Sequence, residues 1–395
     1  MTDLEQFTDE VRTFLAEKLT PELRRAGELS AGIYVDQPVA KEWHRILYHQ
    51  GWSVPAWPVE YGGTGWSMAE HAIFERELRL ARAPVLGPNA TRMVGPSVIA
   101  FGTEEQKARI LPGIRSGDDW WAQGYSEPGA GSDLASLQCR AVREGDSYVI
   151  NGTKIWTTHA HSSNKMFCLV RTDNSGKPQQ GITFLLFDLD LPGIEIRPLL
   201  SISGDHEFNQ VFFNDVRVPV SAVLGKENDG WTVAKYLLQH ERGNAYATGL
   251  QVKLGQLKAF ASQEPAGGRA PLMDDPAFAR KFASAKIELD VLNSLEMKIF
   301  SSVANGEPIG SLSSLTKIRG TELRQLVTEL VVEAVGHYAA PHQADVREYM
   351  SNVEPIGSLT AVVALPQYLN DRAASIYAGS NEIQRNIMAK AILGL

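Results

Sequence analysis

The amino-acid sequence predicts an α+β protein in which an N-terminal helical domain, a central antiparallel β domain and a C-terminal helical bundle follow one another. Two observations predict this class. Apolar residues recur with a helical period over the first 118 residues and again from about residue 224 onward, whereas residues 119–223 hold short β-rich runs with no helix between them. A chain of 395 residues also exceeds one typical domain. We therefore predict domains at 1–118, 119–223 and 224–395.

The N-terminal part carries the helical spacing in several segments. The first has apolar side chains at Leu4, Phe7, Val11, Phe14 and Leu15, and because it lacks the basic and apolar regions of a secretory signal we predict a structural helix. Later segments with the same spacing read "KEWHRILYHQG", "SMAEHAIFERELRLARA" and "TEEQKARILPGIRSG".

The central and C-terminal parts differ in their apolar period. The runs "YVIN", "KMFCLVRT", "GITFLLFDL" and "NQVFFNDVRV" are separated by Gly, Pro, Asn and Asp, which is typical of an antiparallel sheet. Beyond them the sequence predicts one helical stretch over 231–261, a loop over 263–276, helices over 275–304 and 312–338, and a last helix pair.

Composition and charge exclude several classes of protein. A formal net charge of -8 without a basic stripe argues against a nucleic-acid partner. No apolar run is long enough to cross a bilayer, so no membrane partner is expected. The two cysteines, Cys139 and Cys168, have no metal-binding spacing, and we expect buried, inert thiols, no metal site and a reducing cytoplasm.

The segment "GYSEPGAGSD", residues 124–133, concentrates glycines, hydroxyls and acids. It lacks the Gly-Lys-[Ser/Thr] ending of a phosphate-binding P-loop and the glycine spacing of a Rossmann fingerprint. Small residues nevertheless let a backbone approach an anionic ligand closely. Taken alone, the segment favours a plain surface turn over a ligand-binding loop.

Three ordered motifs, in the matching domain order, make the chain resemble the acyl-CoA dehydrogenase family over essentially its whole length. "GYSEPGAGSDLA" is similar to the first flavin segment of that family, "INGTKIWTT" to its second, and "IYAGSNEIQRNIMAKAILGL" to its C-terminal signature. Phrases such as "WPVEYGGTGWS" are similar to chains described as pimeloyl-CoA dehydrogenase large subunits. The resemblance implies an acyl-CoA dehydrogenase-like fold and FAD as cofactor.

The resemblance also implies which residues contact the cofactor. Tyr125 and Ser126 would meet the edge of the isoalloxazine ring, Trp156 would lie against the flavin, and the Thr158 hydroxyl would lie near N5. Ser132 would lie where the cofactor pyrophosphate and the substrate approach each other. The full set of implied cofactor contacts is Gln123, Tyr125, Ser126, Ser132, Trp156, Thr158, Gly379, Ser380, Asn381 and Glu382.

The implied reaction is α,β-desaturation of an acyl-CoA thioester, which requires a base beside Cα and donors to the thioester oxygen. The family often places a glutamate at the position that Ala378 occupies here, so that position has no carboxylate. A second family site on the helix after the sheet matches Glu241, with Arg242 beside it. The resemblance further implies that Ser132, Gln239, Arg242 and the backbone N–H of Ala378 contact the substrate.

The sequence also offers other candidates for the catalytic base. His240 is adjacent to Glu241 but points about 100° away around a helix, and an acid on a partner chain or Glu382 is a further alternative. The alternatives to a dehydrogenase are a flavin-dependent oxidase or monooxygenase of the same fold and a non-catalytic subunit. An electron-transfer flavoprotein is the expected electron acceptor.

Two departures from the family pattern concern the quaternary structure. The segments that carry FAD contacts across subunits in the family read "PAGGRAPLMDDP" and "VEAVGHYAAP" here, with Glu333 where the family has Gln. A different partner chain would then complete the FAD site, as in an α2β2 heterotetramer; a homo-oligomer that uses residues such as Arg269 is the alternative. The sequence does not determine the length or the end group of the acyl chain. A carboxylate at its far end would need a buried cation at the end of the acyl pocket, and the sequence does not show whether a candidate such as Arg92 lies there.

Overall fold

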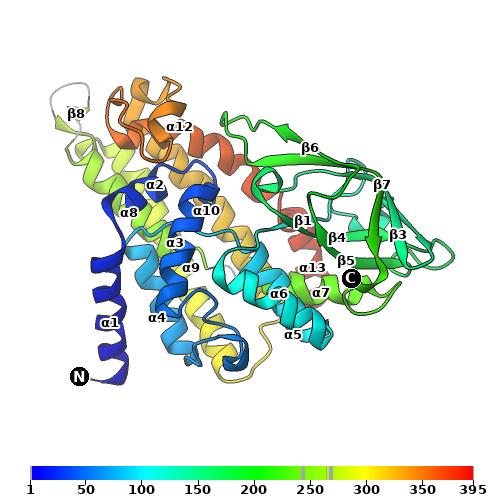
Figure 1. Cartoon of the computed structure of the whole chain (residues 1–395). Coiled ribbons are helices and arrows are strands. Elements are labelled where there is room, and N and C mark those ends of the chain that lie inside the picture. Colours follow the sequence, from blue (N-terminus) through cyan, green and yellow to red (C-terminus); the bar gives the residue numbers. More distant parts are fainter. Residues whose placement is uncertain (1, 242–244, 264, 267–269, 395) are drawn as a thin grey trace.

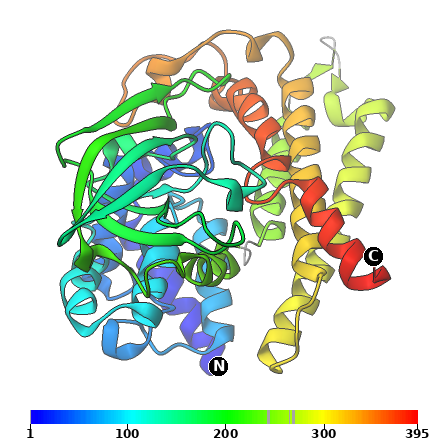
Figure 2. The ribbon, with the colours of Figure 1, turned by 90° about the vertical axis from the view of Figure 1, so that its right-hand side faces the viewer.

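The chain folds into an N-terminal helical lobe, a central sheet and a C-terminal helical bundle, in a computed structural model that describes residues 2–241, 245–263, 265–266 and 270–394. Figure 1 shows the N-terminal helices in blue on one side and the sheet in green on the other. Figure 2 shows the C-terminal bundle, in yellow to red, beside the sheet, with the last helix at the outer edge of the molecule. The α, β, α order expected from the sequence is confirmed.

The N-terminal lobe forms where the helical spacing predicts it. Thr2, Ser67 and Thr103 each cap a helix with a side-chain oxygen and belong to a capping box, which fixes the helix starts. Aromatic rings then fill the lobe, with Phe14 packed between Trp43 and Trp52. Its elements are α1 (Asp3–Lys18), α2 (Pro21–Leu29), α3 (Gln37–Gln50), α4 (Met68–Leu80), the π-helix η2 (Asn89–Val94), α5 (Gly95–Phe101) and α6 (Glu104–Ser116).

The central sheet has seven strands in the described chain, and its pairing corrects one expectation. Most neighbours are antiparallel, as expected, but β1 runs parallel to β4, from the pair Trp121–Lys165 to the pair Gly124–Cys168, and β2 meets β4 in parallel at one residue pair. The β2–β3 hairpin between β1 and β4 gives the chain room to return in the same direction. The strands are β1 (Trp121–Gly124), β2 (Arg140–Glu144), β3 (Ser147–Lys154), β4 (Lys165–Arg171), β5 (Ile182–Asp188), β6 (Ile194–Leu199) and β7 (Phe208–Pro219).

The C-terminal bundle departs from the sequence expectation at its start and at its loop. The stretch 231–261 is two helices, α7 and α8, rather than one. The described part of 263–276 contains a short hairpin, β8 (Pro265–Ala266) with β9 (Ala270–Pro271). The helices are α7 (Gly230–Glu241), α8 (Ala247–Ala261), α9 (Pro276–Ala304), α10 (Leu312–Val335), α11 (Ala344–Arg347), α12 (Leu359–Asp371) and α13 (Asn381–Leu393). Apolar side chains including Leu250, Leu289 and Val327 form the core between α8, α9 and α10.

Both cysteines are free and fully buried, as expected. Burial raises the pKa of the Cys139 thiol to about 11 and raises the pKa of Cys168 still further, so both thiols stay protonated near neutral pH. Among the helices in the described ranges, none is both long and apolar enough to cross a membrane.

Candidate active site

The two flavin segments meet through a buried ion pair that the sequence analysis did not find. The Lys154 side chain is fully buried, and its Nζ donates to Glu127 Oε1 at 2.7 Å and to the Tyr125 carbonyl at 3.1 Å. Glu127 also accepts the backbone N–H groups of Gln138 at 2.6 Å and Cys139 at 2.9 Å. Because each residue lies inside one of the two motifs, this pair fixes the segments against each other.

The first segment begins as a tight turn. Glu127 and Ala130 exchange two backbone hydrogen bonds of 3.0 Å, and the chain beyond them, from Gly131 to Asp133, is exposed. Ser132, expected to contact cofactor and substrate, lies in this exposed part. The small residues thus present a bare stretch of backbone, which suits close approach by a ligand.

The Trp156 side chain of the second segment projects into solvent. Its indole is 61% exposed, its backbone adopts a left-handed conformation with φ of 58°, and its ring packs at right angles to that of Phe208 with the two ring centroids 6.1 Å apart. The neighbouring residues hold it there, because the backbone N–H of Ile155 donates to the Ser126 carbonyl and that of Thr157 donates to the Asn209 carbonyl. A large exposed ring on a strained backbone is typical of a binding surface.

Thr158 lies on a small cavity between the second segment and the N-terminal lobe. The cavity, about 40 Å³, also touches Trp121, Tyr34 and Asn89. Trp121 Nε1 at this cavity, and the Oγ1 of Thr157, which precedes Thr158 in the chain, are buried and have no hydrogen-bond partner in the described chain. Groups of this kind are costly unless a ligand or water engages them, so this region fits a polar ligand.

Gln123 and Tyr125 occupy different surroundings. Gln123 is half-buried on β1. The Tyr125 ring packs edge-on against Phe167 and Phe184 in the core, with centroid distances of 5.8 and 6.3 Å. The Tyr125 ring therefore packs in the core, and the Tyr125 carbonyl accepts a hydrogen bond from Lys154 Nζ.

The C-terminal signature forms a strained turn before α13. Ala378 has a φ of 54°, and its backbone N–H meets no acceptor within the described ranges, which suits donation to a ligand. Ser380 caps α13 through its side chain, and Gly379 precedes it in the left-handed region. Glu382 is exposed in the first turn of the helix.

Asn381 anchors this turn to α10. Its side chain is buried against Thr321 and Lys317, at hydrogen-bond distances of 3.2 Å. Lys317 Nζ also donates to the Ala374 carbonyl at 2.7 Å. The Asn381 amide is therefore occupied by structural bonds, whereas the Ala378 N–H has no acceptor in the described chain.

The helix predicted to carry the base is in place, but its functional side chains lie outside the described residues. The backbone of α7 runs from Gly230 to Glu241 and packs on β5 and α5 through Val233, Ala234 and Leu237. The side chains of Gln239, His240 and Glu241, and the whole of Arg242, are not among the described parts, so their predicted roles stay predictions.

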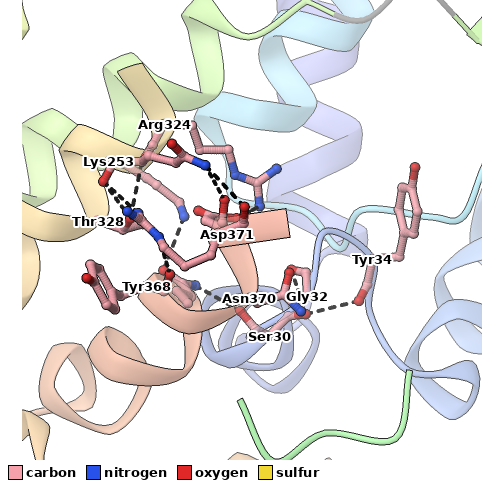
Figure 3. Close-up of polar contacts among 12 residues, drawn as sticks. Ser30, Gly32, Tyr34, Lys253, Arg324, Thr328, Tyr368, Asn370 and Asp371 are labelled. Atoms are coloured by element: carbon pink, nitrogen blue, oxygen red, sulfur yellow. Dashed lines mark hydrogen bonds and ion pairs between the residues drawn. The ribbon is translucent and has the colours of Figure 1, made fainter. Parts of the chain in front are cut away.

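A buried polar network links the three parts of the chain, and the sequence analysis missed most of it. Figure 3 shows Arg324 of α10 directed at Asp371 of α12, in an ion pair whose carboxylate is fully buried. Next to Asp371, the Asn370 amide donates to the Glu207 carboxylate at 3.1 Å, and the Glu207 carbonyl accepts the His159 backbone N–H at 2.8 Å. His159, directly after the second flavin segment, is thereby tied to α12, the helix before the C-terminal signature. These residues are far apart in the sequence and belong to no shared motif.

The fold, the positions of the motifs and the sequence comparisons all indicate the same class of protein. Sequence models of the acyl-CoA dehydrogenase N-terminal, middle and C-terminal domains match residues 1–118, 122–216 and 228–393. The chain belongs to the acyl-CoA dehydrogenase family and is an oxidoreductase. Membership of this family implies a flavin cofactor.

Particular relatives cover nearly the whole chain. The chain is 35% identical to "Acyl-CoA dehydrogenase IpdE1" of Mycobacterium tuberculosis, covering 100% of this chain and 98% of that one. It is 32% identical to "Acyl-CoA dehydrogenase FadE26" of the same organism, covering 99% and 96%.

Solved structures agree with this assignment. The "Tcur3481-Tcur3483 steroid ACAD" structure has 31% identity and a TM-score of 0.84, covering 99% of this chain and 97% of that one. The ChsE4-ChsE5 complex from Mycobacterium tuberculosis has 30% identity and a TM-score of 0.83, covering 100% and 98%.

Proposed function

We propose that the chain is an FAD-dependent acyl-CoA dehydrogenase that introduces an α,β double bond into an acyl-CoA thioester. The observation that carries the proposal is the surface that the two flavin segments form together. The buried ion pair of Lys154 with Glu127 holds the segments against each other, and the Trp156 side chain is exposed on their surface. The unpartnered Thr157 hydroxyl and Trp121 N–H beside this surface also fit a bound polar ring system.

FAD, when bound, supplies an acceptor for the hydride that leaves the β-carbon. The proposed base is Glu241, which takes the α-proton, and the proposed donor to the thioester oxygen is the free N–H of Ala378. Trp156, Thr158, Gln123, Ser126 and the Tyr125 backbone would hold the flavin. The remaining predicted contacts, Ser132, Gln239, Arg242, Gly379, Ser380 and Glu382, belong to the same proposal.

An anaerobic titration with acyl-CoA thioesters tests the function, because substrate should bleach the yellow flavin. In Glu241→Gln the side chain keeps its shape but cannot accept a proton, so the rate of flavin reduction should fall by on the order of 10² to 10⁴ while ligand binding persists. His240→Gln is the matched control and should change the rate only slightly. A Glu241→Gln rate within a few-fold of the unaltered enzyme would remove Glu241 from the mechanism.

Exposed apolar side chains support an oligomer. Ile287, Val291 and Met297 on α9 are between 56% and 64% exposed, and Ile392 and Leu393 at the end of α13 are exposed to a similar degree. Ile287 and Val291 are one helical turn apart and share a face of α9, and exposed apolar faces of this kind mark protein interfaces. Two structural relatives, Tcur3481-Tcur3483 and ChsE4-ChsE5, are pairs of different chains, so we propose an α2β2 assembly with a second acyl-CoA dehydrogenase-like chain.

Co-purification with a candidate partner chain tests this assembly. The mass of the complex and its FAD content should rise together when the partner is present, because the partner would complete the cofactor site. Full FAD occupancy in a complex of this chain alone would favour the homo-oligomer instead.

The electron acceptor separates the proposal from its alternatives. An electron-transfer flavoprotein should reoxidise the reduced enzyme rapidly, whereas rapid reoxidation by air would favour an oxidase or monooxygenase. A colourless protein that no acyl-CoA affects would indicate a non-catalytic subunit. The two buried free thiols are compatible with a reducing cytoplasm as the site of action.

A further inference from the structure

One face of α10 carries polar side chains where the helix packs against the rest of the bundle. They are Ser314, Lys317, Thr321 and Gln325, at spacings of three, four and four residues, which place them on one face of the helix. Ser314, Lys317 and Thr321 are buried, and Gln325 is half-buried. We call these four residues the polar face of α10. Buried polar groups are costly unless they are hydrogen-bonded, so their partners indicate what the polar face holds.

The polar face bonds to the chain just before the strained turn at Ala378. Lys317 Nζ donates to the Ala374 carbonyl at 2.7 Å, and Gln325 Nε2 donates to the Ser375 hydroxyl at 3.3 Å. The chain that enters the turn is therefore fixed to α10 by side chains rather than by backbone pairing.

The polar face also bonds to the chain just after the turn. Asn381, at the start of α13, is buried, and its Oδ1 lies 3.2 Å from both Lys317 Nζ and the Thr321 hydroxyl. Ser314 Oγ donates to Gln384 Oε1 at 2.8 Å. Among the polar-face residues, Lys317 is the one whose bonds within the described chain reach both sides of the turn.

The turn between these two ends has a conformation that its own residues disfavour. Ala378 and Gly379 both have positive φ, 54° and 77°, and for alanine this left-handed region is costly. Both residues are exposed, so packing around them does not impose the conformation. Gln384 Nε2 donates to the Gly379 carbonyl at 3.3 Å. The shape of the turn thus depends on the bonds at its ends, and Lys317 makes one of them on each side.

The Lys317 ammonium is buried and forms no ion pair in the part of the chain that the structure describes. Its two acceptors are neutral oxygens, the Ala374 carbonyl and Asn381 Oδ1, and the centroid of the Tyr377 ring lies 5.9 Å from Nζ. Burial lowers the pKa of Lys317 to about 8, against the opposing effect of the Glu382 charge, so the ammonium keeps its proton at neutral pH. A charged donor makes stronger hydrogen bonds than a neutral one. The buried charge therefore strengthens the two bonds that fix the turn.

We propose that Lys317 is a positioning residue that directs the Ala378 N–H at the thioester oxygen of the substrate. Lys317 acts through the turn, because it bonds to Ala374 on one side of Ala378 and to Asn381 on the other. A donor best stabilises the negative charge that develops on a thioester oxygen when it is aimed at that oxygen before the reaction begins. The inference rests on the proposed acyl-CoA dehydrogenase function and adds the residue that holds the donor in place.

The test compares two probes that differ only at the thioester carbonyl. The acyl-CoA that bleaches the flavin at the lowest concentration sets the acyl chain, and the probes are its 2-enoyl-CoA product and the thioether in which CH₂ replaces the carbonyl. Neither probe reduces the flavin, so the change that each causes in the flavin absorbance of the holoenzyme gives its Kd. In the unaltered protein the thioester should bind at least about tenfold more tightly than the thioether, because only the thioester accepts the Ala378 hydrogen bond.

Lys317→Met keeps an unbranched side chain of similar length but cannot donate a hydrogen bond. It should reduce the ratio of the thioether Kd to the thioester Kd by about fivefold or more, while the thioether Kd itself changes by less than about twofold. The rate of flavin reduction at saturating acyl-CoA should also fall by about tenfold or more, because the misdirected donor stabilises less of the charge on the oxygen. Lys258→Met, at an exposed position on α8, is the matched control and should change neither the ratio nor the rate.

A second variant decides the question if Lys317→Met does not fold. Thr321→Val keeps the shape of the side chain but removes the hydroxyl that holds Asn381, and it should lower the ratio by about twofold or more. An unchanged ratio in the folded, flavin-loaded variant would show a purely structural role and overturn the inference, as would equal binding of the two probes by the unaltered protein. Both results leave the proposed function intact, because acyl-CoA still bleaches the flavin. Failure of every acyl-CoA to bleach the flavin would overturn the proposed function and the inference together.

Discussion

Lys154 and Glu127 illustrate how single residues hold the proposed flavin surface together. Both charges are removed from water, and Glu127 satisfies two backbone N–H groups besides the ammonium. A buried pair of this kind contributes little when compared with apolar residues of the same shape, but losing one partner leaves an unpaired charge in the core. Loss of either partner would therefore destabilise the two segments that position Trp156.

Lys154→Met should therefore lower the free energy of unfolding by about 3–5 kcal/mol. Lys281→Met is the matched control, because Lys281 pairs with Glu333 on the surface and such pairs contribute about 0–1 kcal/mol. Urea unfolding of the flavin-loaded protein measures both. Adding Glu127→Gln to Lys154→Met should recover part of the loss, since no unpaired charge is then left in the core, although the amide oxygen replaces only one of the two acceptor oxygens. Equal effects of Lys154→Met and Lys281→Met would show that the pair does not act as described.

Helix α7 owes its position to a glycine at its first residue. A Cβ on Gly230 would lie 2.5 Å from the Phe184 nitrogen and 2.6 Å from the Thr183 carbonyl carbon, both in β5. Only glycine lets the helix start so close to the sheet. Because Glu241 lies at the other end of α7, any displacement of the helix start is transmitted to the proposed base.

Gly230→Ala should lower the free energy of unfolding by about 1–3 kcal/mol and slow flavin reduction, because the backbone must move to admit the methyl group. Gly255→Ala on α8 is the matched control, since a Cβ there meets nothing within 4 Å. This second change should raise the free energy of unfolding by about 0.5–1 kcal/mol, as expected for glycine in a helix interior. Thermal unfolding and stopped-flow reduction compare the two variants. An unaltered reduction rate in Gly230→Ala would show that α7 is not positioned by this contact.

The whole molecule is joined at Glu207, where all three parts of the chain meet. The carboxylate lies against Gly32 of the N-terminal lobe and accepts a hydrogen bond from Asn370 of α12. Burial raises its pKa to about 7, and the nearby charges are Asp205, Arg324 and Asp36, with Arg347 paired to Asp205. The folded chain therefore keeps a proton on Glu207 at pH values where the unfolded chain has lost it.

The sign of the pH dependence follows from that difference. Between about pH 4.5 and 7 the folded state binds more protons, so Glu207 makes the free energy of unfolding fall as the pH rises, by on the order of 3 kcal/mol over the interval. Glu207→Gln cannot ionise and should lose this part of the pH dependence, which makes it increasingly stable relative to the unaltered protein up to pH 7 and above. Denaturant unfolding across this pH range measures the difference. Glu348→Gln, at an exposed site, is the control, and parallel pH profiles for Glu207→Gln and the unaltered protein would contradict the assignment.

The sequence by itself determined the order of helical and β parts, because apolar period and capping are local properties that neighbouring residues set. It also determined the family, since the three motifs are contiguous stretches. Glu241 as the base came from the same kind of match and stays a prediction, as its side chain lies outside the described residues.

Only the tertiary structure decided which distant residues share an environment. The parallel pairing of β1 with β4, the ion pair of Arg324 with Asp371, and the ion pair of Lys154 with Glu127 join positions that carry no common pattern in the chain. Charged side chains interact strongly when folding removes them from water and brings them within a few ångströms of one another. Such distances depend on the packing of whole helices and strands, which no local stretch of sequence specifies.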